Sequence, residues 1–354
     1  MRNEILILGA TGRSGQDVAA RLHASGIPLV LAGRSRPGLE ALVDRMGGGA
    51  RILAQSWESQ LSSLSTDPPG VVVNTVGPFA STSRAVALAL PLGTHYVDIA
   101  NEFSPVDDIL ALDDRAKASE QTLVTGAGFG VLATETIALW VCAGMPHPAR
   151  LRVDAMPALA LDGGRVGDAL AGSIIEVLRF GGREVRSGTL VRSATASRPE
   201  RLVTPDGDEL TTGGGASGEL LAAWRASGAA QVVAASTAAP SGALVRRVAL
   251  PVMNGAIRVP GVAGMLRRIV ARVSLPTAPM SRPSSWAHAR AEWADGSTRD
   301  GWLRVGDGST FTADVMAETA RRLLAGTQPP GAFTPGALFG HEYAELFGAR
   351  ITTP

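Results

Sequence analysis

The most informative residues of the chain lie near its N-terminus, where three glycines recur at every third position. An apolar stretch at residues 4–8 precedes them, and a helical pattern at residues 16–24 follows. Glycines at such a junction let the backbone approach a phosphate group at the positive N-terminus of a helix. The pattern predicts a loop that binds the pyrophosphate of a dinucleotide, formed by Gly9, Ala10, Thr11, Gly12, Arg13, Ser14 and Gly15. A glycine turn that serves only strand–helix packing is the alternative.

The next expected strand, residues 28–32, is followed by Gly33, Arg34 and Ser35 and ends without an acidic residue. An Asp or Glu at this point would bind the ribose hydroxyls of NAD and repel a 2′-phosphate. Arg34 instead offers a bidentate partner for that phosphate, with Ser35 as a second donor and Arg13 nearby. The sequence therefore predicts NADP(H) as the cofactor. A solvated surface arginine is the alternative for Arg34.

A third group of residues stands at the end of the strand expected at residues 71–76. Open α/β sheets bind their ligands at the carboxyl ends of their strands. We therefore expect this segment to line the nicotinamide ribose, with a plain Gly-Pro turn as the alternative. The segment consists of Asn74, Thr75, Val76, Gly77 and Pro78.

Groups suited to acid–base chemistry follow on the next expected strand, residues 96–99. Tyr96 and Asp98 belong to that strand, and Glu102 follows at the same edge of the sheet. Each could move a proton or accept a hydrogen bond from a substrate. Buried structural roles for Tyr96 and Asp98 are the alternative.

Several other chemistries are excluded by residue counts. Lys117 is the only lysine, so the chain has neither a Walker A loop nor the Tyr-x-x-x-Lys pair of short-chain dehydrogenases. The Gly-x-Ser-x-Gly motif of serine hydrolases is also absent. The histidines show no metal-ligand spacing, so we expect no metal site.

Composition sets broader limits. A length of 354 residues suits about two domains. The 33 basic and 32 acidic residues leave a charge of +1, which lacks the excess that nucleic-acid binding requires. The single cysteine, Cys142, cannot form an internal disulfide and suits a reducing compartment. The chain shows no secretory pattern and no long apolar run, so we expect a cytoplasmic protein.

The spacing of the elements predicts an α/β fold with a Rossmann-type doubly wound parallel sheet over residues 1–130. An α+β substrate or dimerisation domain is expected over residues 131–310. A C-terminal helix and tail occupy residues 311–354, and packing back on the first domain is one option for them. The expected strands are residues 4–8, 28–32, 51–54, 71–76, 96–99 and 122–125, and the expected helices are residues 16–24, 83–90 and 106–119.

In the second half, the pattern predicts strands at residues 150–156 and 184–191 and a helix at residues 168–180. A hairpin is expected from residues 302–305 and 310–312, followed by a helix at 313–324 and a loop-like tail beyond Pro329. Residues 262–273 form a basic amphipathic helix, which we expect to pack its apolar side inward. Binding to an anionic membrane surface is the less favoured alternative.

Several motifs together resemble the saccharopine dehydrogenase-like oxidoreductases, and most closely the bacterial trans-acting enoyl reductases. These motifs include Gly77-Pro78-Phe79, the segment from Gly93 to Asp98, Gly126-Ala127-Gly128-Phe129 and the C-terminal segment from Phe311 to Gly340. The chain departs from the usual Gly-Phe-Asp-x-x-Pro-x-Asp pattern, in which it keeps one acid, Glu135.

The resemblance implies hydride transfer from NADPH to a polarised C=C or C=N bond of a small metabolite or biosynthetic intermediate. The substrate would be free or bound to a carrier protein or coenzyme A, and a homodimer is one option for the assembly. The candidates for proton donation or charge stabilisation are Tyr96, Asp98, Glu102 and Glu135. A non-catalytic NADP-binding redox sensor or scaffold is the alternative function.

Overall fold

The computed structural model describes residues 3–163, 165–239, 242, 245–257, 259 and 261–353. The chain divides into two units and passes between them several times. The first unit contains Met1–Ala100, Pro105–Gly128 and Ser309–Leu338, and the second contains Asn101–Ser104, Phe129–Gly308 and Phe339–Pro354. The sequence-based boundaries at residues 130 and 310 lie close to two of these crossings, whereas the short excursion at Asn101–Ser104 had no counterpart in the prediction.

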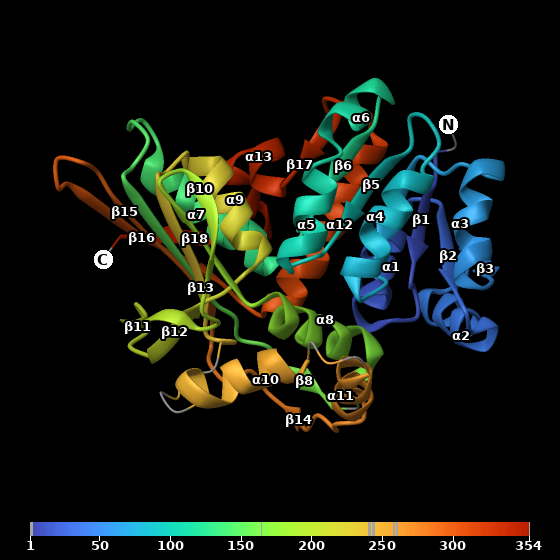
Figure 1. Ribbon diagram of the computed structural model, residues 1–354. Helices are drawn as coiled ribbons and strands as arrows, with labels where there is room; N and C mark the ends of the chain where they lie inside the picture. The colour runs from blue at the N-terminus through green and yellow to red at the C-terminus, as the bar shows by residue number, and fades with distance from the viewer. Residues whose placement is uncertain are drawn as a thin grey trace. The chain divides into compact units, whose positions relative to one another are not determined.

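The first unit is built on a seven-stranded parallel sheet in the order β17-β6-β5-β4-β1-β2-β3, with helices on both faces (Figure 1). The predicted doubly wound Rossmann-type sheet is therefore confirmed. Its strands are β1 (Ile5–Leu8), β2 (Leu29–Gly33), β3 (Arg51–Ala54), β4 (Val71–Asn74), β5 (His95–Asp98), β6 (Thr122–Val124) and β17 (Gly331–Phe333). Its helices are α1 (Arg13–Ala24), α2 (Arg36–Met46), α3 (Trp57–Thr66), α4 (Phe79–Ala89), α5 (Phe103–Leu110), α6 (Asp113–Ala118) and α12 (Gly308–Leu324).

The central strands are apolar because both faces of the sheet are covered. Every residue of β1, β2 and β4 is buried, as continuous apolar runs in parallel sheets require. The register places Leu8 of β1 beside Ala32 and Asn74. The carboxyl ends of three neighbouring strands thus meet at one edge, which is where ligands bind in such sheets.

Residues Ser309–Leu338 return to this unit, whereas Phe339–Pro354 belong to the second unit. β17 pairs in parallel with β6, and Arg21 of α1 forms an ion pair with Asp314 of α12. The expected loop-like tail is wrong, because residues beyond Pro329 form β17, α13 (Pro335–Phe339), the 3-10 helix η2 (His341–Phe347) and β18 (Arg350–Thr352).

The second unit contains a nine-stranded mixed sheet whose main path is β10-β9-β13-β7-β15-β16-β18. Its strands are β7 (Arg150–Met156), β9 (Gly182–Arg186), β10 (Thr189–Ser193), β11 (Ser197–Val203), β12 (Glu209–Gly214), β13 (Gln231–Ser236), β15 (Ser285–Glu292), β16 (Thr298–Val305) and β18, and β8 (Leu161–Asp162) pairs separately with β14 (Thr277–Ala278). Its helices are α7 (Phe129–Cys142), α8 (Gly167–Phe180), α9 (Gly218–Ser227), α10 (Leu250–Ala256) and α11 (Val262–Ala271), and the π-helix η1 (Val245–Ala249) precedes α10. The predicted second domain of mixed helices and strands is confirmed.

Helices α7 and α9 contact each other and cover one face of this sheet. Leu151 and Val153 of β7 are buried, whereas Arg152 and Asp154, which alternate with them, belong to the opposite face. Among the described residues, no helix is long and apolar enough to cross a membrane.

Two predicted elements are wrong for reasons of turn chemistry and periodicity. The strand expected at residues 184–191 is a hairpin, because Ser187 and Gly188 form a two-residue turn between β9 and β10. The second arm expected at residues 310–312 is helical. Phe311 and Val315 are both buried and lie four residues apart on one face of α12.

A buried ionic network crosses the second sheet. The His288 ring lies between Asp154, 3.1 Å from Nδ1, and Asp300, 2.8 Å from Nε2. Burial alone would lower the pKa of His288, but the two carboxylates raise it to about 9. Burial alone would raise the pKa of Asp154, but hydrogen bonds from His288 and Arg152 hold it below its ordinary value. His288 is therefore a buried cation with two anionic partners.

We predict that this network makes stability depend on pH. The pKa of His288 is about 9 in the folded chain against 6.5 in the unfolded chain. Its contribution is therefore fully present below pH 6.5 and is lost as the pH rises through 9, by up to about 3 kcal/mol. The free energy of unfolding of the wild type, measured by urea titration, should fall over this range relative to His288→Gln. Parallel pH curves for the two proteins would contradict the assignment.

Candidate functional site

The glycine loop between β1 and α1 is as tightly packed as a nucleotide-binding turn requires. The amide of Gly12 donates to the carbonyl of Gly9 over 2.9 Å. A Cβ atom on Gly15 would lie 2.3 Å from the Gly9 oxygen and 2.9 Å from the Cα of Ala10. No larger residue fits at position 15 without moving the backbone. The loop therefore brings the first turn of α1, which contains no acidic residue, close to the end of β1, where the helix N-terminus favours an anion.

Thr75 holds this loop from the neighbouring strand. Its hydroxyl donates to the carbonyl of Leu8 over 2.7 Å and lies 3.2 Å from that of Gly9. Its backbone amide also donates to Leu8 over 3.0 Å. The sequence analysis assigned Thr75 to the nicotinamide ribose, whereas the structure gives its side chain a role in shaping the pyrophosphate loop.

The residues expected to recognise a 2′-phosphate are exposed where β2 ends. Arg34 and Arg13 are both exposed, and neither forms an ion pair within the described part of the chain. The Ser35 hydroxyl accepts from the Gly38 amide over 3.2 Å and so caps α2, which leaves its own proton for a ligand. Free cationic groups beside the β2 end are what a 2′-phosphate needs.

Asn74 faces the interior. It is fully buried, its Nδ2 donates to the Tyr96 hydroxyl over 3.1 Å, and its Oδ1 accepts from the Val76 amide over 3.0 Å. The Gly77–Pro78 peptide bond that follows is cis and leads directly into α4. Asn74 therefore positions the turn at residues 76–78, and only the turn itself remains as a candidate for ribose contact.

Asp98 is the centre of a buried hydrogen-bond network. Its Oδ2 accepts from the hydroxyls of Ser83 and Tyr96, each at 2.8 Å. Its Oδ1 accepts from the Thr125 hydroxyl at 2.8 Å and from the amides of Ala100 and Gly126, each at 3.1 Å. Five donors from α4, β5 and the segments after β5 and β6 thus surround one carboxyl group.

This network bears on the two roles considered for Tyr96 and Asp98. Both side chains are completely buried. Burial and the charge of Asp98 raise the pKa of Tyr96 well above its ordinary value. Burial also raises the pKa of Asp98, against the lowering effect of its hydrogen bonds. The geometry favours the structural alternative, because each polar atom already has a protein partner.

A second buried acidic cluster lies in the second unit. Asn101 and Glu102 come three and four residues after Asp98 and belong to the excursion at Asn101–Ser104. The Asn101 Nδ2 donates to Oε1 of Glu219 over 3.1 Å, and Glu102 accepts from the Asn101 amide. Gly130 of α7 packs directly against this cluster. A Cβ atom at position 130 would lie 2.4 Å from Oδ1 of Asn101 and 2.7 Å from Oε1 of Glu219, so a larger residue does not fit there.

Glu219 has the properties of a general acid, and the sequence analysis missed it. It is 4% exposed, and its Oε2 makes no hydrogen bond to any atom that the structure describes. Burial raises its pKa against the lowering effect of Ser217, its own backbone amide and Asn101, and the negative charge of Glu102 adds to the rise. The only signal in the sequence is a Ser-Gly-Glu start to a helix, far from Asn101 along the chain.

The four predicted catalytic residues are thus divided between the two units. Tyr96 and Asp98 lie inside the first, whereas Glu102 and Glu135 lie in the second. Glu102 is 7% exposed and pairs through an isolated β-bridge with Ser217, while Glu135 is buried within α7.

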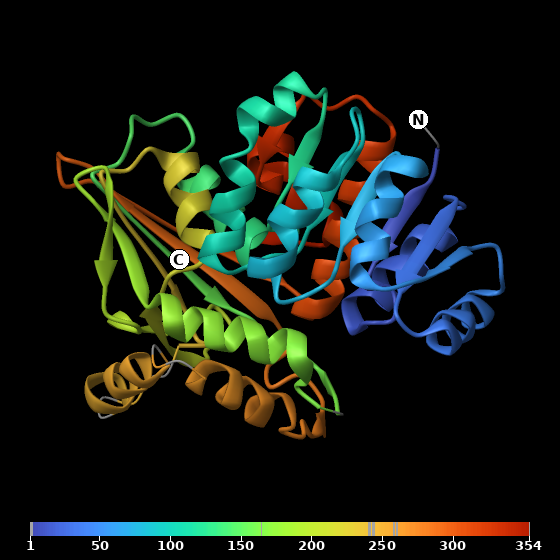
Figure 2. The same ribbon diagram turned by 45° about the vertical axis from the view of Figure 1, so that its right-hand side comes forward.

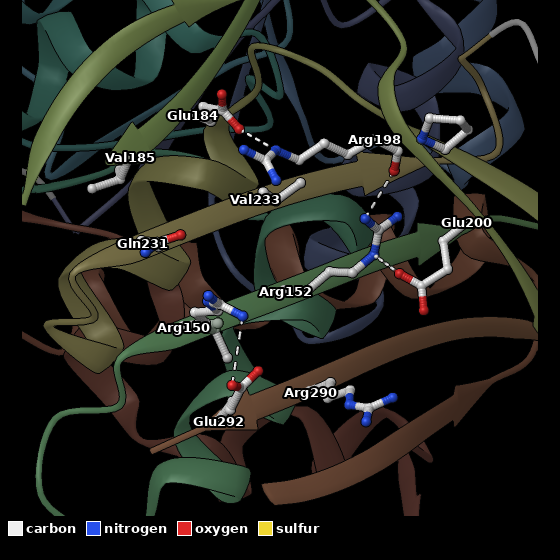
Figure 3. Close-up of a pocket in the computed structure, with 12 residues that line it drawn as sticks. Arg150, Arg152, Glu184, Val185, Arg198, Glu200, Gln231, Val233, Arg290 and Glu292 are labelled. Atoms are coloured by element: carbon white, nitrogen blue, oxygen red, sulfur yellow. Dashed lines mark hydrogen bonds and ion pairs between the residues drawn. The ribbon is translucent and has the colours of Figure 1, made fainter. Parts of the chain in front are cut away.

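The second sheet also carries a charged groove of about 460 Å³ (Figure 3). Most of its charges neutralise one another: Arg152 pairs with Glu200 at 3.1 Å, Arg198 with Glu184 at 2.6 Å and Arg150 with Glu292 at 3.5 Å. Arg290 is exposed and forms no ion pair with the described residues. With its charges paired in this way, the groove is a weaker candidate for cofactor binding than the glycine loop.

We predict that Arg34→Ala removes the preference for NADPH over NADH. A charge-assisted bond to phosphate contributes about 1.5–3 kcal/mol, so NADPH affinity should fall roughly ten- to hundredfold while NADH affinity stays unchanged. Nicotinamide fluorescence titration measures both. Arg36→Ala is the matched control, because Arg36 is a neighbouring exposed arginine that faces Glu40 at 3.8 Å. Equal losses in the two variants would argue against a 2′-phosphate site at Arg34.

We also predict that Tyr96→Phe destabilises the first unit. The substitution leaves the Asn74 amide and one Asp98 oxygen with one partner fewer, which should lower the free energy of unfolding by about 1–3 kcal/mol. Urea denaturation measures the change. Ser81→Ala removes an exposed hydroxyl from α4 and should change stability by less than about 0.5 kcal/mol. Wild-type stability in Tyr96→Phe would exclude the network as a structural element.

Comparison with known proteins agrees with this geometry. Residues 5–124 match the family model of the saccharopine dehydrogenase NADP binding domain, and no curated protein matches the chain. Among solved structures, the fold is similar to apo saccharopine dehydrogenase (L-Glu forming) from Saccharomyces cerevisiae, with 14% identity, full coverage of both chains and a TM-score of 0.63. A probable dehydrogenase from Thermotoga maritima gives 11% identity, coverage of 98% of this chain and 94% of that chain, and a TM-score of 0.45.

The matched residues include the glycine loop after β1, the end of β2 and strand β5, which carries Asp98. All three belong to the first sheet or to the loops at its edge. NADP(H) is accordingly the cofactor of the first unit. The fold of the whole chain agrees with that of saccharopine dehydrogenase. Residues 5–124 thus form a saccharopine dehydrogenase-type NADP-binding domain, within a chain whose overall fold is similar to that of saccharopine dehydrogenase.

Proposed function

We propose that the protein is an NADPH-dependent reductase that transfers a hydride to a polarised C=C or C=N bond of a small metabolite or biosynthetic intermediate. NADPH supplies the hydride when it is bound. The chain must then hold the acceptor carbon in place and provide a proton to the adjoining atom. The observation that carries this proposal is the buried, protonatable Glu219 in a chain that already has an NADP-binding domain.

Glu219 is suited to the proton because its neutral form is favoured. A carboxyl group that loses hydration on burial keeps its proton at higher pH than an exposed one, and that proton is then available to a substrate. Glu102 strengthens the effect through its charge, and the Asn101 amide donates a hydrogen bond to Oε1 of Glu219 that helps to orient the carboxyl group. One Glu219 oxygen is left over for a substrate atom.

Asn101, which donates a hydrogen bond to Glu219, lies close in sequence to the Asp98 strand of the cofactor domain. It follows Asp98 by three residues, and the Asp98 network fixes the strand end from which the excursion at Asn101–Ser104 starts. The segment that carries Asn101 therefore starts from the edge of the first sheet at which such folds bind their ligands.

The proposal names two classes of substrate. The C-terminal and glycine motifs resemble the bacterial trans-acting enoyl reductases, which supports an enoyl thioester carried by a protein or coenzyme A. An imine is the second class to test, since both need one hydride and one proton. We place the reaction in the cytoplasm, because the single cysteine, Cys142, suits a reducing compartment.

A non-catalytic NADP-binding sensor is the second candidate. It is favoured by the structural use of Tyr96 and Asp98, whose polar atoms are committed to the buried network. A sensor requires no protonatable group for a substrate, so the role of Glu219 discriminates between the two functions.

We predict that Glu219→Gln lowers turnover by about 10²–10⁴-fold, because the amide keeps the shape of the carboxyl but cannot donate its acidic proton. NADPH oxidation is followed with a panel of enoyl thioesters and imines, first with the wild type and then with the variant on any substrate found. NADPH affinity, measured by fluorescence, should stay within about twofold.

Glu58→Gln is the matched control, because Glu58 is an exposed carboxylate in the first turn of α3. Its turnover should equal that of the wild type. Wild-type turnover in Glu219→Gln would exclude Glu219 as the proton donor. A wild type that binds NADPH but reduces no member of the panel would favour the sensor.

A further inference from the structure

Helix α11 exposes part of its apolar side. Met265, Ile269 and Val273 follow one another at four-residue spacing and are 53%, 55% and 49% exposed. Met265 and Ile269 therefore lie on one face of α11, and Val273 follows just beyond the end of that helix at Ala271. Within the described chain, none of the residues of α11 is buried, although α11 contacts α8. The expectation that this helix packs its apolar side inward is therefore wrong for this face.

The preceding helical segment has a similar apolar row. Val245, Val248 and Val252, in η1 and α10, are 41%, 52% and 67% exposed and follow at spacings of three and four residues. Both views show α10 and α11 along the same outer side of α8 (Figures 1 and 2). We call these six side chains, together with Arg268 and Arg272, the helical patch.

The chain segment that contains the helical patch carries charge of one sign. Between Glu219 and Glu292 the sequence contains nine arginines and neither Asp nor Glu. Arg268 and Arg272 are exposed, precede Ile269 and Val273 in the chain, and form no ion pair with any described residue. The patch therefore combines exposed aliphatic side chains with cations that lack counterions of their own, which is complementary to an anionic, apolar partner.

We propose that the helical patch binds the surface of a membrane that contains anionic phospholipids. The aliphatic side chains would enter the boundary between headgroups and acyl chains, and the guanidinium groups would bind lipid phosphates. The attachment is interfacial, since α11 has only 10 residues and a spanning helix needs about 20.

Two features disfavour a protein as the occupant. A second copy of the chain would bring arginine against arginine, because the segment carries no acid. Protein interfaces also rely on aromatic anchors, and no Phe, Tyr or Trp occurs between Trp224 and Trp286. A lipid surface needs neither a complementary shape nor such anchors.

The test is co-sedimentation of the full chain with vesicles. We expect binding to vesicles of equal parts phosphatidylglycerol and phosphatidylcholine, and at least tenfold weaker binding to phosphatidylcholine alone. Raising the salt to about 0.5 M should weaken the binding, because it screens the arginine charges. Absence of binding to the anionic vesicles, or equal binding to both compositions, would overturn the proposal.

Variants locate the attachment. Arg268→Gln with Arg272→Gln should weaken binding by about fivefold for each charge removed, or roughly 25-fold together, and Met265→Gln with Ile269→Gln should weaken it by at least tenfold. Arg290→Gln and Leu92→Gln are the controls, since Arg290 is an exposed arginine of the second unit and Leu92, in the first unit, is 77% exposed. NADPH affinity should be unchanged in all four, and urea denaturation curves like that of the wild type show that the second unit, which contains the patch, is folded.

Light scattering completes the test by measuring the mass in solution. We expect the mass to be the same for the wild type and for Met265→Gln with Ile269→Gln. If the wild type is an oligomer that this double variant dissociates, a second copy of the chain covers the patch and the membrane proposal is wrong. The proposal is also wrong if neither double variant binds the anionic vesicles less tightly than the controls do.

Discussion

The buried carboxyl group of Asp98 is the constraint on which the cofactor domain depends. A carboxyl group without water must obtain its hydrogen bonds from the protein, and Asp98 obtains five, from α4, from β5 and from the segments after β5 and β6. Through Tyr96 and Asn74 the same network reaches the end of β4. Thr75 then extends the support from β4 to the glycine loop. The binding edge of the sheet is therefore held in place by its own hydrogen bonds.

This constraint also changes which residues can do chemistry. Tyr96 and Asp98 are of catalytic types, but their polar atoms are bound within the network. In the proposed function, we therefore assign proton donation to Glu219, whose Oε2 has no hydrogen-bond partner among the described residues and whose Oε1 accepts from Asn101. Burial raises the pKa of both carboxyl groups, but Asp98 accepts five hydrogen bonds, whereas Oε2 of Glu219 accepts none from the described residues. We therefore propose different roles for these two buried carboxyl groups, because their hydrogen-bond partners differ.

Local patterns were sufficient to predict the cofactor half of the molecule from its sequence. The strand, glycine loop and helix at residues 4–24 are contiguous, and the absence of an acid at Arg34 is a local feature. Glu219 could not be predicted, because it meets Asn101 only after the chain has folded. The β9–β10 hairpin was missed since residues on both sides of Ser187 have strand character. The amphipathic pattern of α11 revealed an apolar stripe but not what the stripe faces, because periodicity contains no information on tertiary partners.

The most direct test of the account uses NADPH carrying deuterium at the transferable C4 position, incubated with the wild-type protein and with enoyl thioesters or imines. Mass spectrometry of the products reports whether hydride transfer occurs. The account predicts one deuterium in the reduced product for each NADPH consumed. Tight binding of NADPH without label transfer to any acceptor would contradict it and would leave a nucleotide-binding protein whose buried Glu219 has no substrate.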